Sequence, residues 1–311
     1  MQLHRAEDGR WSIQGLAAKE MQAKRVWADA LPRYLDILDE LFDRAQTTRE
    51  FDFIHSLIPV RGVQDAGWDA WETTQDAMRA LVPLINESTE WATRRHLKLW
   101  TWGHVIEAAE PYELLRNLLE VAVGGRFHVE WFPDAAGGRP QHPLDKINQI
   151  DAAAKRAGLA DVGVPLREIW DRDLRNAVFH ADYALYGGEV NLPKVGRSLG
   201  HEAVELLVGR ADAYLGAIVT LRDVYIGDYN EPKLISARGF SADPDGKAWV
   251  IVRKGHGAVG LKHALSASEI AVGGIPWRLG VFTREELELL DADPTLAQLP
   301  ARKEAGAPEL G

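Results

Sequence analysis

Residues 94–125 read RRHLKLWTWGHVIEAAEPYELLRNLLEVAVGG, which is the longest helical pattern in the chain. Residues of one face recur in it at spacings of three and four: Leu97, Thr101, His104, Ala108, Tyr112, Leu115, Leu119 and Ala122. Pro111 has to break or kink this helix, because proline lacks an N–H and its ring clashes with the carbonyl one turn earlier. Gly124 and Gly125 end it. The stretch predicts a long helix, interrupted at Pro111, in a mainly α fold.

Helical patterns continue on both sides of this stretch. Further helices are predicted over residues 16–30, 32–42, 68–81, 145–157, 165–181 and 199–225. Pro32 and Pro165 each suit the first turn of a helix, where the missing N–H costs nothing. These patterns together predict a helical bundle.

Three parts of the chain have β character. Residues 183–185 and 190–192 flank a tight turn at Gly187-Gly188 and predict a small hairpin. The aromatic residues 126–132 predict a short strand. Residues 249–252 read WVIV and follow an Asp-Pro-Asp-Gly turn signal, so another strand is expected there.

The change of character near residue 232 predicts how the chain is organised. Residues 1–232 would form a helical core with additional N-terminal helices, and residues 233–299 a small, mixed C-terminal region that contains β-strands. Residues 283–286 resemble a capping box that opens a last short helix. Residues 300–311 are rich in Ala, Gly, Pro and Glu, which predicts a disordered tail.

Bulk composition limits the classes of function. The formal net charge is −10, whereas a protein that attracts nucleic acid over long range is normally basic, so any such function must use a local site. The absence of cysteine excludes disulfides, thiolate metal sites and a cysteine nucleophile. No run of roughly 18 apolar residues and no signal-like N-terminal stretch occur, so we expect a cytoplasmic protein without membrane spans.

Residues 171–183 read DRDLRNAVFHADY and carry the candidate chemistry. Arg175 is followed at once by Asn176 and, after three more residues, by His180. This string resembles the signature of the HEPN superfamily, in which an arginine precedes a polar residue, often Asn, a short gap and a histidine. The resemblance covers the helical portion, roughly residues 68–230, although only this segment matches specifically.

The resemblance implies metal-independent endoribonuclease activity, with no cofactor. His180 would act as general base or acid on the ribose 2′-hydroxyl or the leaving oxygen, which suits a side chain whose reference pKa is about 6.5. Arg175 would hold the scissile phosphate and stabilise the charge that builds on its oxygens. Asn176 would orient His180 or bind the phosphate. A role in defence or as a toxin follows from family analogy alone.

Helix geometry constrains this site. Residues five apart on an α-helix are separated by about 140° around its axis, so Arg175 and His180 cannot point the same way on a regular helix. Asn176 and His180, four apart, share a face. Either the helix ends near Phe179, or the site is shared between two subunits. The family commonly uses the second arrangement, so a homodimer is expected.

Residues around the motif are the candidates for binding substrate: Arg172, Asp182, Tyr183, His104 and Glu107. His104, Glu107 and Glu110 recur at a spacing of three, which can place metal ligands on one helix face. No second Glu-x-x-His segment is evident, so this group is better explained as a structural polar cluster, or as support for the motif helix.

Three hypotheses remain open. The first is a HEPN-like endoribonuclease that acts on RNA, in which an inhibitory protein partner is also conceivable. The second is a non-catalytic HEPN-like module that binds RNA, a nucleotide or a protein. The third is a helical interaction protein in which Arg175, Asn176 and His180 form a structural hydrogen-bonding cluster. Replacement of His180 discriminates between them, because it would abolish cleavage, alter binding or mainly lower stability.

Overall fold

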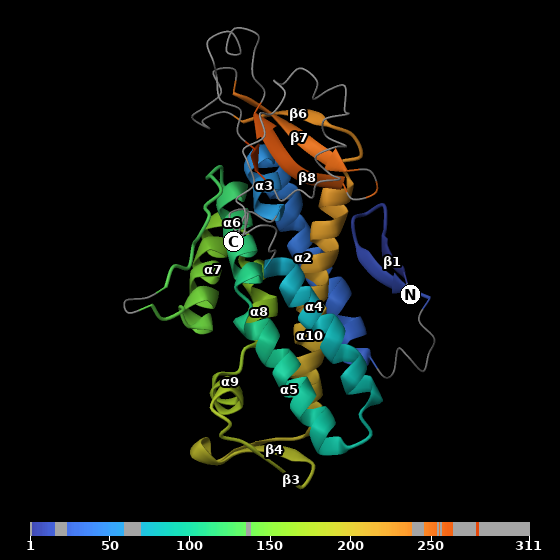
Figure 1. The fold of residues 1–311 in the computed structure, drawn as a ribbon, viewed down its shortest axis with the longest axis vertical. Coiled ribbons are helices and arrows are strands. Elements are labelled where there is room, and N and C mark those ends of the chain that lie inside the picture. The colour runs from blue at the N-terminus through green and yellow to red at the C-terminus, as the bar shows by residue number, and fades with distance from the viewer. Residues whose placement is uncertain are drawn as a thin grey trace, which may run out of the picture. The chain divides into compact units, whose positions relative to one another are not determined.

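The computed structural model describes residues 2–15, 24–58, 70–134, 138–237, 246–253, 255, 257–263 and 278–279. The fold is mainly α with small antiparallel sheets, as the sequence predicts (Figure 1). The chain divides into two compact units: Met1–Arg49 with Asp69–Asp223, and Glu50–Trp68 with Val224–Gly311. Among the described residues, no helix combines the length and the apolar character needed to cross a membrane.

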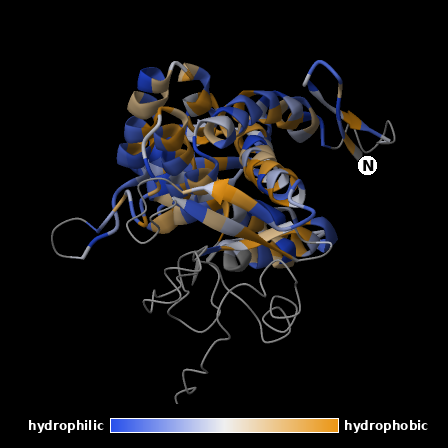
Figure 2. Cartoon of the chain, turned by 90° about the horizontal axis from the view of Figure 1, so that it is seen from above, coloured by the Kyte–Doolittle hydropathy of each residue, from blue (hydrophilic) through white to orange (hydrophobic). Residues whose placement is uncertain are grey.

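The core of the first unit is built on α2 (Arg25–Thr48), which packs against α6 (Ala109–Ala122). The largest side chains that α2 buries completely are Leu31, Tyr34, Leu35, Leu38, Leu41 and Phe42. The helices of this unit carry both hydrophobic and hydrophilic residues in Figure 2, as expected for amphipathic helices. Their buried faces, rather than any sheet, hold the unit together.

The N-terminal region departs from the prediction in two ways. Pro32 lies inside α2 rather than at the start of a helix. Its missing N–H leaves the Ala28 carbonyl without its helical donor, which costs about 3 kcal/mol and is offset by the apolar burial along α2. An unpredicted hairpin, β1 (Gln2–Arg5) and β2 (Trp11–Gln14), precedes it, and the Trp11 indole donates to Asp39 at 3.1 Å.

The central helical stretch is interrupted, but three residues before the expected point. It forms α5 (Trp91–Glu107) and α6, separated at Ala108, so Pro111 sits in the first turn of α6, where its N–H is not needed. The helix predicted over residues 68–81 is present as α4 (Ala70–Glu87). The prediction of an interrupted helix is thus confirmed, with the break moved toward the N-terminus.

The predicted strand at residues 126–132 is wrong. The backbone N–H of His128 donates to Oδ1 of Asn117 at 2.8 Å, and the N–H groups of Trp131 and Phe132 donate to the carboxylate of Glu113. Side chains of α6 therefore take the place of a neighbouring strand, and the segment needs no sheet partner.

The helix predicted over residues 165–181 is divided into α8 (Val164–Ile169) and α9 (Arg172–Phe179). The buried Trp102 donates its indole N–H to the Ile169 carbonyl at 3.0 Å, which removes that acceptor from the helical ladder. Asp171 then caps the new helix by accepting from the backbone N–H of Leu174 at 2.9 Å. Before them come α7 (Pro143–Ala157), close to its predicted bounds, and the short helix η1 (Ala160–Gly163).

The hairpin after the motif is confirmed as β3 (Ala184–Tyr186) and β4 (Glu189–Leu192). Both glycines of its turn have positive φ, as the two-residue turn requires. A third strand, β5 (Arg197–Leu199), pairs with β4 after the short helix η2 (Pro193–Val195). The long helix α10 (His201–Gly227) follows and matches the one predicted over residues 199–225.

The second unit joins α3 (Glu50–Leu57) to an antiparallel sheet of four strands. Their order is β6 (Lys233–Ser236), β7 (Lys247–Arg253), β8 (Gly257–His263) and β9 (Arg278–Leu279), and α3 packs on β6 and β8. The strand predicted at residues 249–252 is part of β7. The predicted capping box at 283–286, most of the Asp-Pro-Asp-Gly turn and the tail from 300 lie outside the described residues.

Candidate functional site

Helix α9 ends within the motif, between Asn176 and His180. His180 is the residue that caps the C-terminal end, and Ala181 has φ +52°, in the left-handed region. The N–H of Asp182 donates to the Ala177 carbonyl at 2.8 Å and that of Ala181 to Val178 at 3.3 Å, the pair of bonds of a Schellman motif. The first of the two arrangements predicted for the motif, a helix that ends at Phe179, is therefore present.

Arg175 points toward α5. Its Nε donates to Oε1 of Glu107 at 2.7 Å, and its Nη1 donates to Oδ1 of Asn176 at 3.3 Å. Its guanidinium also lies over the ring of Phe179, 5.2 Å from the centroid. Because only 19% of the Arg175 side chain is exposed, against 33% for Glu107, this ion pair is partly shielded from water. The charge that would meet a phosphate is already paired.

His180 has different surroundings. Its side chain is exposed, and no other described side chain binds it. The chain reverses at Ala181 directly after it, so the imidazole is left uncovered at the end of α9. Non-glycine residues seldom adopt a positive φ, and such positions cluster at functional sites. The imidazole of His180 is therefore accessible from solvent.

The segment that carries the motif contacts one face of α5 at three successive points along that helix. The pairs are Arg175 with Glu107, Phe179 with Gly103, and Tyr183 with His96. A Cβ on Gly103 would come within 3.1 Å of the Phe179 ring, so the glycine allows this close approach. His96 Nδ1 and the Tyr183 hydroxyl are 2.7 Å apart in a hydrogen bond. Sequence reasoning did not connect His96 or Gly103 with the motif, although both lie at helical spacing from Glu107.

The other candidate residues have mostly structural partners. Asp182 forms an ion pair with Lys194, and Arg172 is exposed. Burial raises the pKa of Tyr183 above its ordinary value. Arg197 binds both carboxylate oxygens of Asp171, at 2.9 and 2.6 Å. The acidic residues beside the motif are thus largely neutralised, and the surface there repels a phosphate less than the formal charge suggests.

His104 and Glu107 have different surroundings in the structure. Glu107 supports the motif helix through Arg175, as one of the two interpretations anticipated. The Nε2 atom of His104 is buried, and no described group forms a hydrogen bond with it. Within the described part of the chain, no three His, Asp or Glu side chains lie close enough together to hold a metal ion.

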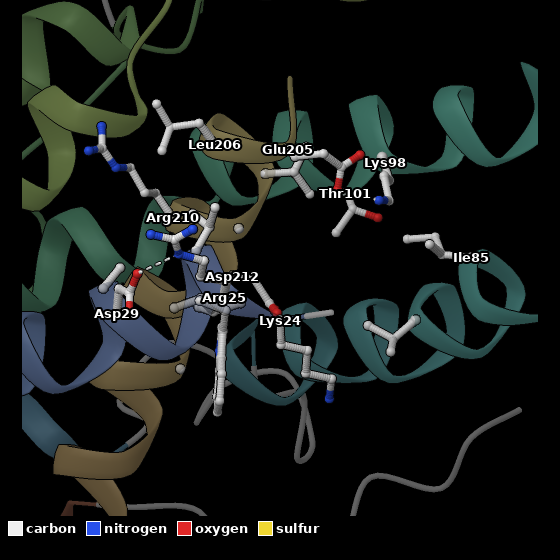
Figure 3. Close-up of a pocket in the computed structure, with 18 of the residues that line it drawn as sticks. Lys24, Arg25, Asp29, Ile85, Lys98, Thr101, Glu205, Leu206, Arg210 and Asp212 are labelled. Atoms are coloured by element: carbon white, nitrogen blue, oxygen red, sulfur yellow. Dashed lines mark hydrogen bonds and ion pairs between the residues drawn. The ribbon is translucent and has the colours of Figure 1, made fainter. Parts of the chain in front are cut away.

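A separate groove of about 1680 Å³ lies in the first unit between α2, α4, α5 and α10 (Figure 3). Charged side chains that line the groove form ion pairs with one another, for example Lys98 with Glu205 at 2.5 Å. Asp212 is exposed in the groove, yet the surrounding walls desolvate its carboxyl and raise its pKa, while the charge of Lys24 opposes that rise. None of the site residues predicted from the sequence lines this groove.

Comparison of the chain with protein-family models, with curated protein sequences and with solved structures found no match in any of the three.

Proposed function

We propose that this chain is a HEPN-like endoribonuclease that cleaves RNA without a metal ion, with Arg175, Asn176 and His180 as catalytic residues. The observation that carries the proposal is the hydrogen bond from Arg175 to the Asn176 side chain, at 3.3 Å. Asn176 shares a face with His180, one helical turn later. The hydrogen bond thus links Arg175 to a residue that, by helical spacing, lies on the face of His180, although Arg175 and His180 themselves are five residues apart.

The proposed reaction is an internal transfer at phosphorus. His180 takes the proton of the ribose 2′-hydroxyl, and the 2′-oxygen forms a bond to phosphorus. The bond from phosphorus to the 5′-oxygen breaks, and that oxygen takes a proton from the protonated imidazole of a second His180, supplied by the homodimer that the family resemblance implies. The products are a 2′,3′-cyclic phosphate and a 5′-hydroxyl. Arg175 would stabilise the negative charge on the phosphoryl oxygens during this step.

The proposal is tested with the purified full-length chain in EDTA, incubated with total RNA and with a set of structured RNAs. We expect cleavage by the wild type and a loss of at least about 100-fold in His180→Ala, the usual size of a general acid–base contribution, and in Arg175→Ala, the usual size of one lost group that stabilises transition-state charge. His4→Ala is the matched control, because His4 is an exposed histidine on β1, away from the motif. Circular dichroism and thermal unfolding establish that each variant is folded. Cleavage that survives in His180→Ala, or that EDTA abolishes, contradicts the proposal.

One observation favours the second hypothesis, a module that binds without cleaving. Arg175 is paired with Glu107, so its charge is compensated before any ligand arrives. A non-catalytic module would bind RNA or a nucleotide with wild-type protein, lose affinity in Arg175→Ala, and release no 2′,3′-cyclic phosphate under any condition. End-group analysis of the RNA after incubation separates the two functions.

A further inference from the structure

Three aromatic rings beside the motif, the exposed Trp100 and the half-buried His96 and Tyr183, form a connected group on α5 and the segment after α9. The rings of His96 and Trp100 have centroids 6.3 Å apart and are inclined by 34°, and those of His96 and Tyr183 are 5.5 Å apart. Trp100 is 54% exposed, whereas Trp11, Trp71 and Trp102 are buried in the core. This tryptophan presents a large aromatic surface to solvent.

A hydrogen bond and a ring contact hold the orientation of these rings. The Tyr183 hydroxyl holds His96 through Nδ1 at 2.7 Å, and His96 packs beside Trp100 one helical turn later. A stacking surface whose rings are already ordered loses little conformational freedom when a planar ligand binds. The arrangement is therefore suited to binding, beyond what packing in the protein alone requires.

The aromatic surface continues toward the motif. Phe179, 48% exposed, lies against Gly103 one turn along α5 from Trp100, and the guanidinium of Arg175 lies over its ring. His180 follows Phe179 directly in the chain. Aromatic faces thus lead from Trp100 to the two residues that would act on a phosphodiester.

We infer that Trp100, ordered by His96 and Tyr183, is a stacking site for an unpaired nucleobase of the bound RNA. This inference rests on the proposed function, because it adds a base-binding position beside the same site. Bases of a double helix are stacked on one another and cannot present a face to a side chain, whereas bases of single strands stack readily on aromatic rings. Stacking also needs no net positive charge, which suits a chain with a formal charge of −10.

The test measures binding by fluorescence anisotropy at fixed ionic strength, in the His180→Ala background, so that the probe is not cleaved. The probes are a labelled mixed-sequence RNA 12-mer, its duplex, and a 12-mer with abasic positions. Trp100→Ala should weaken binding of the single strand about tenfold, the usual size of one base stacked on an aromatic ring. Trp100→Phe, which keeps a ring, should stay within about threefold of the parent. Binding of the abasic strand should not respond to either change.

Trp91→Ala is the matched control, because Trp91 is an exposed tryptophan of the same helix whose contact is with Arg95. The inference is overturned if the parent does not bind the single strand, if Trp91→Ala and Trp100→Ala have equal effects, or if duplex and single strand weaken alike. It is also overturned if light scattering shows that Trp100→Ala dissociates a dimer, since the ring would then contact a second copy of the chain. Trp100-dependent binding without cleavage by the wild type supports the stacking site while contradicting the proposed nuclease. Cleavage that is insensitive to Trp100→Ala supports the proposed nuclease while contradicting the stacking site.

Discussion

Arg175 and Glu107 form an ion pair between α9 and α5, in which Nε and Oε1 are 2.7 Å apart. The pair joins the motif to the helix that carries the aromatic surface. It also sets a condition for the proposed function, because a phosphate must compete with the Glu107 carboxylate for the same guanidinium. On the proposed function, Glu107 therefore has two effects: it holds Arg175 in place, and it lowers the affinity of Arg175 for an anion.

Replacing the carboxylate tests this competition. In Glu107→Gln the amide oxygen can still accept from Arg175, but the negative charge is gone. We expect the dissociation constant for the single-stranded RNA 12-mer to fall about fivefold, which corresponds to about 1 kcal/mol of removed competition. Binding is measured by anisotropy in the His180→Ala background at two salt concentrations.

Glu110→Gln is the control for net charge, because Glu110 lies on α6 three residues further along and forms no ion pair with Arg175. If both variants raise affinity to the same extent, the effect is one of overall charge. If Glu107→Gln weakens binding, the carboxylate positions Arg175 for the ligand, and the idea of competition is wrong.

The strained residue after His180 gives a prediction about stability. Ala181 has φ +52°, which costs a residue with a Cβ about 1–2 kcal/mol, and Gly carries no such cost. Ala181→Gly should therefore raise the free energy of unfolding by about 0.5–1 kcal/mol after the greater entropy of glycine in the unfolded chain is subtracted. Urea unfolding measures the change. Ala184→Gly, in β3, should lower it by a similar amount, and equal losses in both variants would contradict the argument.

The limits of sequence reasoning are clear at particular residues of the fold. Amphipathic periodicity located α4 and α7, because it reports which side of each helix is buried, whereas α10 was located by its recurring apolar residues and is buried on more than one side. It could not detect the break between α8 and α9, since the Ile169 carbonyl is taken by Trp102, a residue 67 positions earlier. The strand predicted at residues 126–132 failed for the same reason, because its hydrogen-bond partners are the distant side chains of Glu113 and Asn117.

In the candidate site, too, local features could be predicted from the sequence and contacts between helices could not. Helix geometry applied to a motif of five-residue spacing offered the end of α9 at Phe179 as one of two alternatives, the other being a site shared between two subunits. The pairing of Arg175 with Glu107, and of Tyr183 with His96, depends on how α5 and α9 lie against each other. Nothing local in the sequence encodes that arrangement, although residues 96, 100, 103 and 107 share a helical face.

The cap of α9 can be separated from its ion pair. Asp171 accepts from the Leu174 N–H and binds Arg197 through both oxygens. Asp171→Ala loses both interactions and should lower the free energy of unfolding by about 1–2 kcal/mol. Asp171→Asn keeps an oxygen for the cap and should lose only about 0.5 kcal/mol. Urea unfolding of both variants and of Arg197→Ala measures the separate contributions of the helix cap and of the ion pair. Equal losses of unfolding free energy in Asp171→Ala and Asp171→Asn would show that the cap contributes nothing.

His55 makes the second unit sensitive to acid. Burial lowers the pKa of this α3 histidine to about 4, although the carboxylate of Asp52 opposes the change. Above a pH of about 6.5, the pKa of histidine in the unfolded chain, His55 is neutral in both the folded and the unfolded state, so its titration takes nothing from the free energy of unfolding. As the pH falls from about 6.5 toward 4 the unfolded chain binds a proton that the native chain does not, so stability should fall by about 3 kcal/mol.

Hydrogen exchange of the α3 amides, corrected for intrinsic rates, measures this loss between pH 7 and pH 4.5. His55→Gln does not titrate, so the dependence attributable to His55 should disappear in this variant, while whatever the carboxylates contribute remains. His4→Gln removes an exposed histidine and should leave the profile of the wild type unchanged. A wild-type profile identical to that of His55→Gln would mean that His55 is protonated as easily in the folded chain as in the unfolded one.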